Sequence, residues 1–192
     1  MRIGAVDRDR ILKICRHELG HFFVAKKLGF KTTNLTFTFH KFKGHLGGAG
    51  LEPNKPGIET IEDIINYLEL RIVILYAGVI SEATDNHGNY DSNYALNQWH
   101  KDGGMQDHAK IRELTFLLRG ILHPETTDNV LIQNQLDSID TGLIQRSGEI
   151  VIENIEVIYD AAYELSSKII LFETPYNFTD QEVTELLSEA LK

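Results

Sequence analysis

The chain has 192 residues, of which 42% are hydrophobic and 24% are charged. These values are ordinary for a globular protein, exclude disordered and fibrous classes, and favour one domain spanning residues 1–192. The net charge is −9, and basic residues are not interleaved with aromatic ones, which argues against nucleic-acid binding.

The charge is unevenly distributed along the chain. Residues 1–56 contain eleven Lys and Arg against four Asp and Glu, whereas the remainder contains eight against twenty-four. A basic surface can attract an acidic ligand or partner, but such an imbalance more often reflects a solvated face of a folded domain. The charge distribution alone therefore identifies no partner.

A single cysteine, Cys15, excludes a disulfide framework and a cysteine-based zinc cluster. Any metal ion must therefore be held by His, Asp or Glu. The N-terminus has no apolar signal segment, and the longest apolar run, residues 72–80, is too short to span a bilayer. These features lead us to expect a cytoplasmic location and no membrane span.

The first predicted helix runs from about Asp9 to Leu28 and ends at Gly29, a residue type common just after a helix C-terminus. The segment 33–52 instead predicts a hairpin. Its first half alternates apolar and polar residues and is rich in Thr and Phe, as strands are. Its glycines then predict a turn and a return strand that ends near Pro53.

A second helix is predicted from about Gly57 to Thr84, because Ile, Leu and Val recur there every three or four residues. Residues 85–104 are polar and contain glycines, so we expect a long connection, a kind of segment that is often functional. A third helix is predicted over residues 107–122.

The C-terminal part is predicted to be helical as well. Thr179 and Glu182 have the spacing of a capping box, which predicts a short final helix. The expected fold class is mainly α (α+β), with one small β-hairpin or sheet near residues 33–52. Before the final helix, six apolar residues are predicted to form one long amphipathic face: Val151, Ile155, Ile158, Ala162, Leu165 and Ile169.

Residues 17–21 read HELGH, in which the spacing of the side chains suits their chemistry. His17 and His21 lie on one side of a helix, one turn apart, so both imidazoles can bind one zinc ion. Glu18 can then accept a proton from a water molecule that zinc has made acidic. Both histidines lie in the apolar stripe of the helix, where a shared metal supplies the polar partner that burial requires. Two separately hydrogen-bonded core histidines are the alternative.

A catalytic zinc site needs a third protein ligand and an open fourth position. Two carboxylates interrupt apolar stripes elsewhere: Glu82 continues the stripe of the second helix, and Asp107 begins that of the third. Either could be the third ligand. Glu82 could instead orient a ligand histidine, and Asp107 could cap its helix or interact with the helix dipole. Any of the remaining histidines could line the cleft, but a surface role is the expectation for each: His40, His45, His87, His100, His108 and His123.

At these residues the chain resembles the peptidase domain of the FtsH family, membrane-anchored AAA+ zinc proteases. HELGH at 17–21 resembles the family's HEAGH helix, and LTFTFHKFKGHLGGAGLEP at 35–53 resembles the strand and glycine turn that follow it. AGVISE at 77–82 is similar to the family's Gly-Gly-Arg-x-x-Glu helix, and DGGMQD at 102–107 to its Thr-Gly-Ala-x-x-Asp segment. The likeness continues to NFTDQEV at 177–183 and covers nearly the whole chain.

The resemblance implies a helical, zincin-like peptidase domain in which His17, His21 and Asp107 bind zinc. It implies Glu18 as general base and Glu82 as a residue that supports the site from outside the zinc ligands. The corresponding function is a stand-alone, ATP-independent zinc metalloendopeptidase that acts on peptides or unfolded protein segments. An extended substrate could add a strand to a sheet edge offered by residues 33–42.

The chain also departs from the family's pattern. Val79 replaces the usual Arg, Asp102 replaces Thr, and Gly104 and Met105 are expected to loosen the turn before Asp107. No GxxxxGK[ST] phosphate loop occurs and no membrane helix is predicted, so ATP-driven degradation of folded proteins is not implied. A homo-oligomer and a separate ATPase partner stay open. The alternative function is a non-catalytic, metal-binding or regulatory module that retains the fold.

Overall fold

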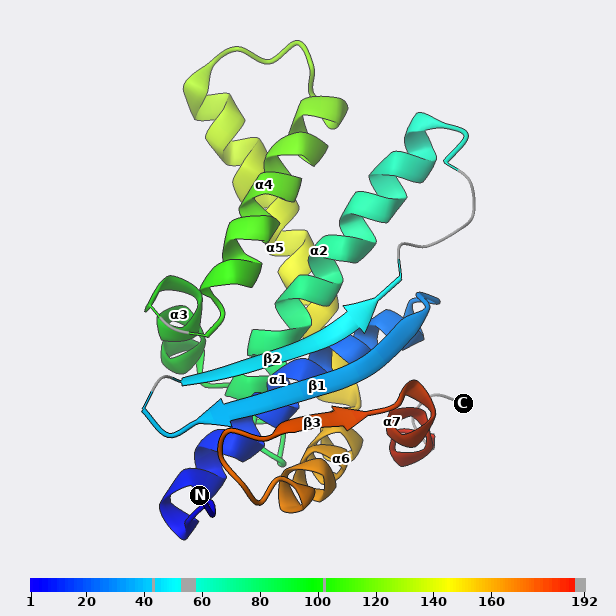
Figure 1. The fold of residues 1–192 in the computed structure, drawn as a ribbon. Helices are drawn as coiled ribbons and strands as arrows, with labels where there is room; N and C mark the ends of the chain where they lie inside the picture. The colour runs from blue at the N-terminus through cyan, green and yellow to red at the C-terminus, as the bar shows by residue number, and fades with distance from the viewer. Residues whose placement is uncertain (43, 53–57, 102, 189–192) are drawn as a thin grey trace.

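The computed structural model describes residues 1–42, 44–52, 58–101 and 103–188. Helices dominate, and a small antiparallel sheet lies over the N-terminal helix (Figure 1). The mainly α (α+β) class predicted from the sequence is thereby confirmed. The elements follow in this order: η1 (Ala5–Asp7), α1 (Arg8–Lys27), β1 (Thr32–His40), β2 (Gly44–Leu51), α2 (Ile61–Ala83), α3 (Ser92–Lys101), α4 (Met105–Leu122), α5 (Asn129–Glu153), α6 (Ile155–Lys168), β3 (Pro175–Phe178) and α7 (Asp180–Leu186).

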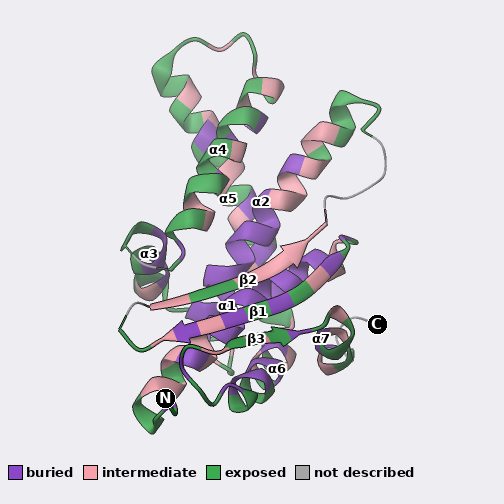
Figure 2. Cartoon of the chain, in the orientation of Figure 1, coloured by how far each residue is buried: buried purple, intermediate pink, exposed green. Residues whose placement is uncertain are grey.

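The first helix, α1, is the central element of the fold and matches its predicted bounds within one residue. Gly29 follows it with a φ of 82°, a left-handed conformation that glycine adopts without strain. Every residue from Ile14 to Ala25 is buried, so this part of the helix is enclosed by the rest of the protein (Figure 2). The HELGH segment therefore places polar side chains inside the core.

The second helix, α2, begins with a capping box. The Thr60 hydroxyl accepts a hydrogen bond from the Asp63 N–H, and the Asp63 carboxylate accepts one from the Thr60 N–H. The start predicted near Gly57 lies outside the described residues. Of the helices in the described part of the chain, α2 alone is long and apolar enough to cross a membrane, and 67% of its most apolar window is buried in the protein. Core helices share these properties, so α2 does not establish a membrane span.

The helices α1 and α2 cross closely because a glycine lies at their contact. A Cβ added at Gly20, the fourth residue of HELGH, would collide with the Ser81 side chain and the Ala77 carbonyl oxygen. The absence of a side chain at this point brings the HELGH segment against the C-terminal half of α2, where Glu82 is also buried.

The sheet has the strand order β2-β1-β3, with both pairings antiparallel. The predicted hairpin is confirmed as β1 and β2, in which Thr36 lies opposite Gly48. On the other side of β1 lies β3, which the sequence prediction did not include, with Asn177 opposite Thr36. β1 is therefore central, and the sheet edge predicted at residues 33–42 is wrong. Among the described strands, β2 is the edge strand on the side of the candidate site.

The polar segment 85–104, predicted as a connection, contains the helix α3. The Asp91 carboxylate accepts a hydrogen bond from the Tyr94 N–H near the start of this helix, and the apolar side chains of Ala95 and Trp99 are buried. A short helix with so few buried apolar residues produces almost no periodic signal, which explains the wrong prediction. The next helix, α4, begins two residues earlier than predicted, at Met105.

The long amphipathic face predicted near the C-terminus is buried, but two helices contribute to it. α5 and α6 are separated at Asn154, whose φ of −122° and ψ of 14° depart from helical values. The predicted capping box between Thr179 and Glu182 is confirmed at the start of α7.

Candidate metal centre

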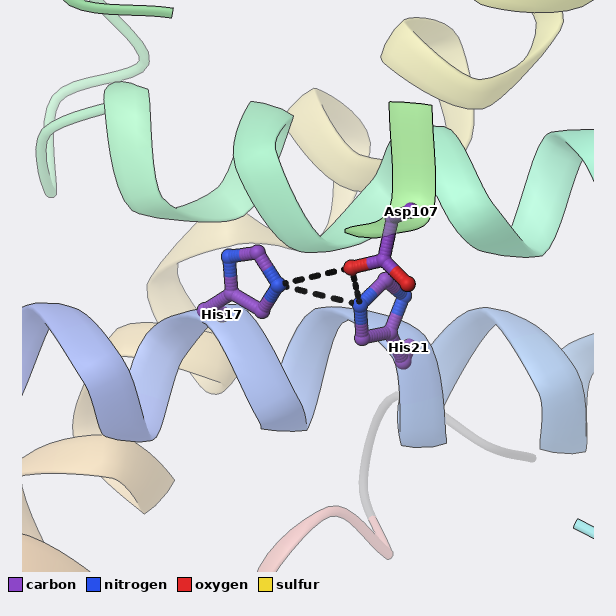
Figure 3. A group of neighbouring side chains, drawn as sticks. All are labelled: His17, His21 and Asp107. Atoms are coloured by element: carbon purple, nitrogen blue, oxygen red, sulfur yellow. Dashed lines mark hydrogen bonds and ion pairs between the residues drawn. The ribbon is translucent and has the colours of Figure 1, made fainter. Parts of the chain in front are cut away.

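Three side chains from two helices meet beside the crossing of α1 and α2. His17 and His21 come from α1, and Asp107 comes from the first turn of α4 (Figure 3). The two Nε2 atoms lie 3.1 Å apart, and each lies 3.2 Å from Asp107 Oδ2. These three atoms form a nearly equilateral triangle, which we call the ligand triangle.

The hydrogen bonds formed by the Nδ1 atoms of the two imidazoles determine where the lone pairs of their Nε2 atoms point. His21 Nδ1 lies 2.8 Å from the Ile74 carbonyl oxygen, which can only accept, so this nitrogen carries the hydrogen. His17 Nδ1 lies 3.0 Å from Glu82 Oε2 and donates to that carboxylate. Both Nε2 atoms therefore turn lone pairs toward each other and toward Asp107. Because three acceptors cannot satisfy one another, a proton or a metal cation must lie among them.

Without a metal ion, a proton satisfies the ligand triangle. Burial lowers the pKa of His17, but hydrogen bonds to Asp107 and Glu82 outweigh burial and raise this pKa to about 10. Burial also raises the pKa of Asp107, but its electrostatic interactions and hydrogen bonds with His21 and His17 reverse that effect and hold the pKa far below its usual range. The buried carboxylates thus create a negative potential that favours a bound cation.

The dimensions of the ligand triangle suit a transition-metal ion. A tetrahedral zinc ion with bonds of about 2.0–2.1 Å holds its ligand atoms about 3.3–3.4 Å apart, close to the observed 3.1–3.2 Å. Gly78 of α2 packs against the triangle: a Cβ there would collide with the His21 ring and would lie 2.8 Å from His17 Nε2. The three residues can therefore hold a metal ion, and their donor set suits zinc or non-haem iron(II).

Glu82 lies on the far side of His17 from the ligand triangle. One of its carboxylate oxygens accepts the hydrogen bond from His17 Nδ1, and the other accepts one from the Tyr94 hydroxyl. Arg16 donates to the Glu82 carbonyl oxygen. Burial raises the pKa of Glu82, but His17, Tyr94 and Arg16 together lower it below its usual value. Glu82 is thus an ionised partner that fixes the His17 ring, as carboxylates do behind metal-binding histidines.

Asp107 reaches the histidines because α4 begins close against α2. A Cβ added at Gly104, the residue that precedes α4, would lie 2.5 Å from Val79 Cγ2, and the His108 N–H donates to the Gly104 carbonyl at 2.9 Å. Val79 and Gly104, which both depart from the FtsH pattern, therefore pack against each other. The expected loosening of the turn before Asp107 stays a prediction, since these contacts concern only the start of α4. Asp102 lies outside the described residues.

No protein-family model matches the chain, and no curated protein matches its sequence. The resemblance to the FtsH family therefore rests on the motifs alone, and the site's own geometry and chemistry are what bear on function.

Glu18 lies beside the ligand triangle and faces the edge strand. Its Oε1 lies 3.0 Å from the position that a Cβ on Gly47 of β2 would occupy, so the glycine makes room for the carboxylate. Glu18 is buried, yet its carboxylate has no hydrogen-bond partner among the described residues. A buried and unpartnered carboxylate at this position is available to accept a proton from a bound group.

The ligand triangle and Glu18 line a cleft of about 900 Å³ between α1, β2, α2 and the start of α4. His45 of β2 also lines this cleft, so the surface role predicted for it is wrong, and burial lowers its pKa below the usual value. Tyr94 lines the cleft as well, and sequence reasoning missed it because a single tyrosine in a polar segment carries no pattern. Within the described residues, the group that could hold a metal contains no histidine besides His17 and His21.

Separate substitutions of Asp107 and Glu82 should have unequal effects on metal binding. Asp107→Ala removes an atom of the ligand triangle and is expected to empty the site. Glu82→Gln removes only the charge behind His17 and should weaken metal affinity by about 10–100-fold. Titration against a chromophoric chelator measures both affinities. If Glu82→Gln empties the site while Asp107→Ala leaves it filled, Glu82 is the ligand and Asp107 the supporting residue.

Proposed function

We propose that the chain is a zinc-dependent metallopeptidase of the HExxH type, with His17, His21 and Asp107 as zinc ligands and Glu18 as general base. One observation carries the proposal. Three acceptor atoms, two on buried histidines and one on the half-buried Asp107, converge within 3.2 Å of one another. The carboxylate of Glu18, which has no hydrogen-bond partner among the described residues, lies beside them at the wall of a cleft. A purely structural metal site needs neither an additional carboxylate beside the ligands nor an open approach to the metal.

Zinc held by two imidazoles and a carboxylate supplies a Lewis acid that polarises a peptide carbonyl and acidifies water. Glu18 accepts the proton of the attacking water and delivers it to the leaving amine. Glu82, itself held by Tyr94, keeps the His17 ring in one tautomer and one orientation. The burial of these groups lowers the local dielectric, which strengthens each of these electrostatic interactions.

The edge strand β2 supplies a path for the substrate. Its residues 44–49 and Leu51 line the cleft on the side where Glu18 lies, and the glycines at 47 and 48 let another backbone approach closely. An extended peptide can hydrogen-bond to the outer edge of β2 as an added strand, which brings its carbonyl groups past the ligand triangle. This binding mode requires an extended chain, so the expected substrates are peptides and unfolded protein segments.

Metal analysis combined with a cleavage assay tests the proposal. The full chain is stripped with a chelator and reloaded separately with zinc, iron(II) and manganese, and metal per chain is quantified. Cleavage is measured on an unfolded protein and on a mixture of quenched fluorescent peptides. The expected result is about one zinc per chain, with cleavage abolished by the chelator and restored by zinc.

Two outcomes contradict the proposal in different ways. If the protein binds no metal at neutral pH, HELGH is part of a packed helix in which the ligand triangle shares a proton, and the proposal is wrong. Stoichiometric metal without cleavage of any of these substrates supports the alternative of a non-catalytic metal-binding module. Tight iron(II) binding with no zinc-dependent cleavage points to oxidative chemistry instead.

A further inference from the structure

Four cationic side chains line the cleft, and three of them have partners. Arg10 donates to the His40 carbonyl, Lys13 pairs with Asp9, and Lys110 pairs with Asp107. Each of these three cations therefore already interacts with an acceptor of the protein itself. The fourth cation, Arg71 of α2, forms no hydrogen bond or ion pair with the described residues.

The environment of Arg71 makes the lack of a partner costly. Its Nη1 atom is shielded from solvent and has no acceptor. The residues one turn away along α2 are Tyr67, Leu68, Ile74 and Leu75, none of which carries a negative charge. This nitrogen has lost hydration without gaining an acceptor, so an incoming carboxylate that reaches it would bind strongly.

Helix geometry places Arg71 along the path of the substrate. Gly78, against which the ligand triangle packs, follows Arg71 by seven residues. Seven residues are almost two complete turns, so both positions lie on the same face of α2, about 10 Å apart along the axis. An extended peptide covers that distance with about three residues. Arg71 therefore lies within about three residues of the bond that would face the ligand triangle.

We propose that Arg71 binds a carboxylate of the substrate, so that the cleft selects peptides carrying a negative charge within about three residues of the scissile bond. The inference rests on the proposed peptidase function. A planar guanidinium can bind a carboxylate through two parallel hydrogen bonds, which fixes the position of the peptide along β2 as well as attracting it. The carboxylate belongs either to an Asp or Glu side chain or to the C-terminus of a short peptide.

Peptide binding can be measured without turnover. The zinc-loaded Glu18→Gln protein is titrated with fluorescent peptides that are neutral apart from one Glu, moved through successive positions, with Gln peptides as references. Both series are made with amidated and with free C-termini. We expect about tenfold tighter binding of Glu than of Gln at one position, decreasing with added salt. A preference seen only with free C-termini assigns the site to the peptide end, and a preference in amidated peptides assigns it to the side chain.

Substitutions then tie the preference to Arg71. Arg71→Gln should remove it, and Arg71→Glu should transfer it to peptides with Lys at the same position, an exchange that a merely structural role would not produce. Arg146→Gln is the matched control, because Arg146 is exposed on α5 and does not line the cleft. Equal binding of all Glu and Gln peptides by the Glu18→Gln protein that retains Arg71 overturns the inference even if every Arg71 variant fails to fold.

The two proposals fail in distinguishable ways. If the wild-type protein cleaves neutral and acidic peptides equally, the peptidase function stands and the role of Arg71 does not. If no peptide is cleaved but the Glu preference and its exchange are observed, the carboxylate site stands and the peptidase function does not.

Discussion

Glu18→Gln is expected to lower the rate of peptide cleavage by about 10²–10⁴-fold while the metal stays bound. Gln has nearly the same shape as Glu, so it fits the space beside Gly47 that the carboxylate occupies. It cannot accept a proton at neutral pH, and the residue is not part of the ligand triangle. Turnover at saturating substrate, measured together with zinc per chain, separates loss of the base from loss of the metal.

Asp9→Asn provides a matched control for this substitution. Asp9 also lines the cleft, but its side chain is 78% exposed, and among the described residues it forms an ion pair with Lys13, one turn along α1. Loss of an exposed ion pair of this kind changes little, so cleavage should stay within a few-fold of wild type. If Glu18→Gln cleaves peptides as fast as Asp9→Asn does, the general base is another group and the HExxH interpretation of Glu18 is wrong.

The parts of the fold that could be predicted are those specified by short stretches of sequence. The bounds of α1 follow from its apolar stripe and from Gly29, and the start of α7 follows from a capping box. β3 is different, since four residues beginning with Pro175 become a strand only by pairing with β1, far away in the sequence. That pairing also makes β1 central, which is why the position of the free edge could not be predicted from the hairpin alone.

The candidate site shows the same division between local and long-range information. HELGH placed two histidines one turn apart because helix geometry is local. The choice between Glu82 and Asp107 was not local, because it depends on which nitrogen of His17 each carboxylate contacts. The structure places Glu82 at Nδ1, with Asp107 at Nε2 alongside His21. Tyr94 and Arg71 likewise acquire their relation to the site only when α3 and α2 pack around the cleft.

Gly78→Ala is expected to abolish metal binding and destabilise the protein without altering a single charge or donor atom. The added methyl group would occupy the space of the His21 ring and approach His17 Nε2. The rings must then move, which breaks the ligand triangle, and the overpacked contact between α1 and α2 should cost about 1–3 kcal/mol of unfolding free energy. Zinc per chain and chemical denaturation measure the two effects.

Gly142→Ala is the matched control, because Gly142 lies within α5 and nothing lies within 4 Å of an added Cβ there. Alanine at that position should stabilise the helix by about 0.5–1 kcal/mol and leave the metal untouched. If Gly78→Ala lowers the free energy of unfolding and Gly142→Ala raises it, the backbone of α2 shapes the metal site as much as the ligands do. If the Gly78→Ala protein binds one zinc per chain and is as stable as wild type, the histidine rings can accommodate the methyl group and α2 does not confine them.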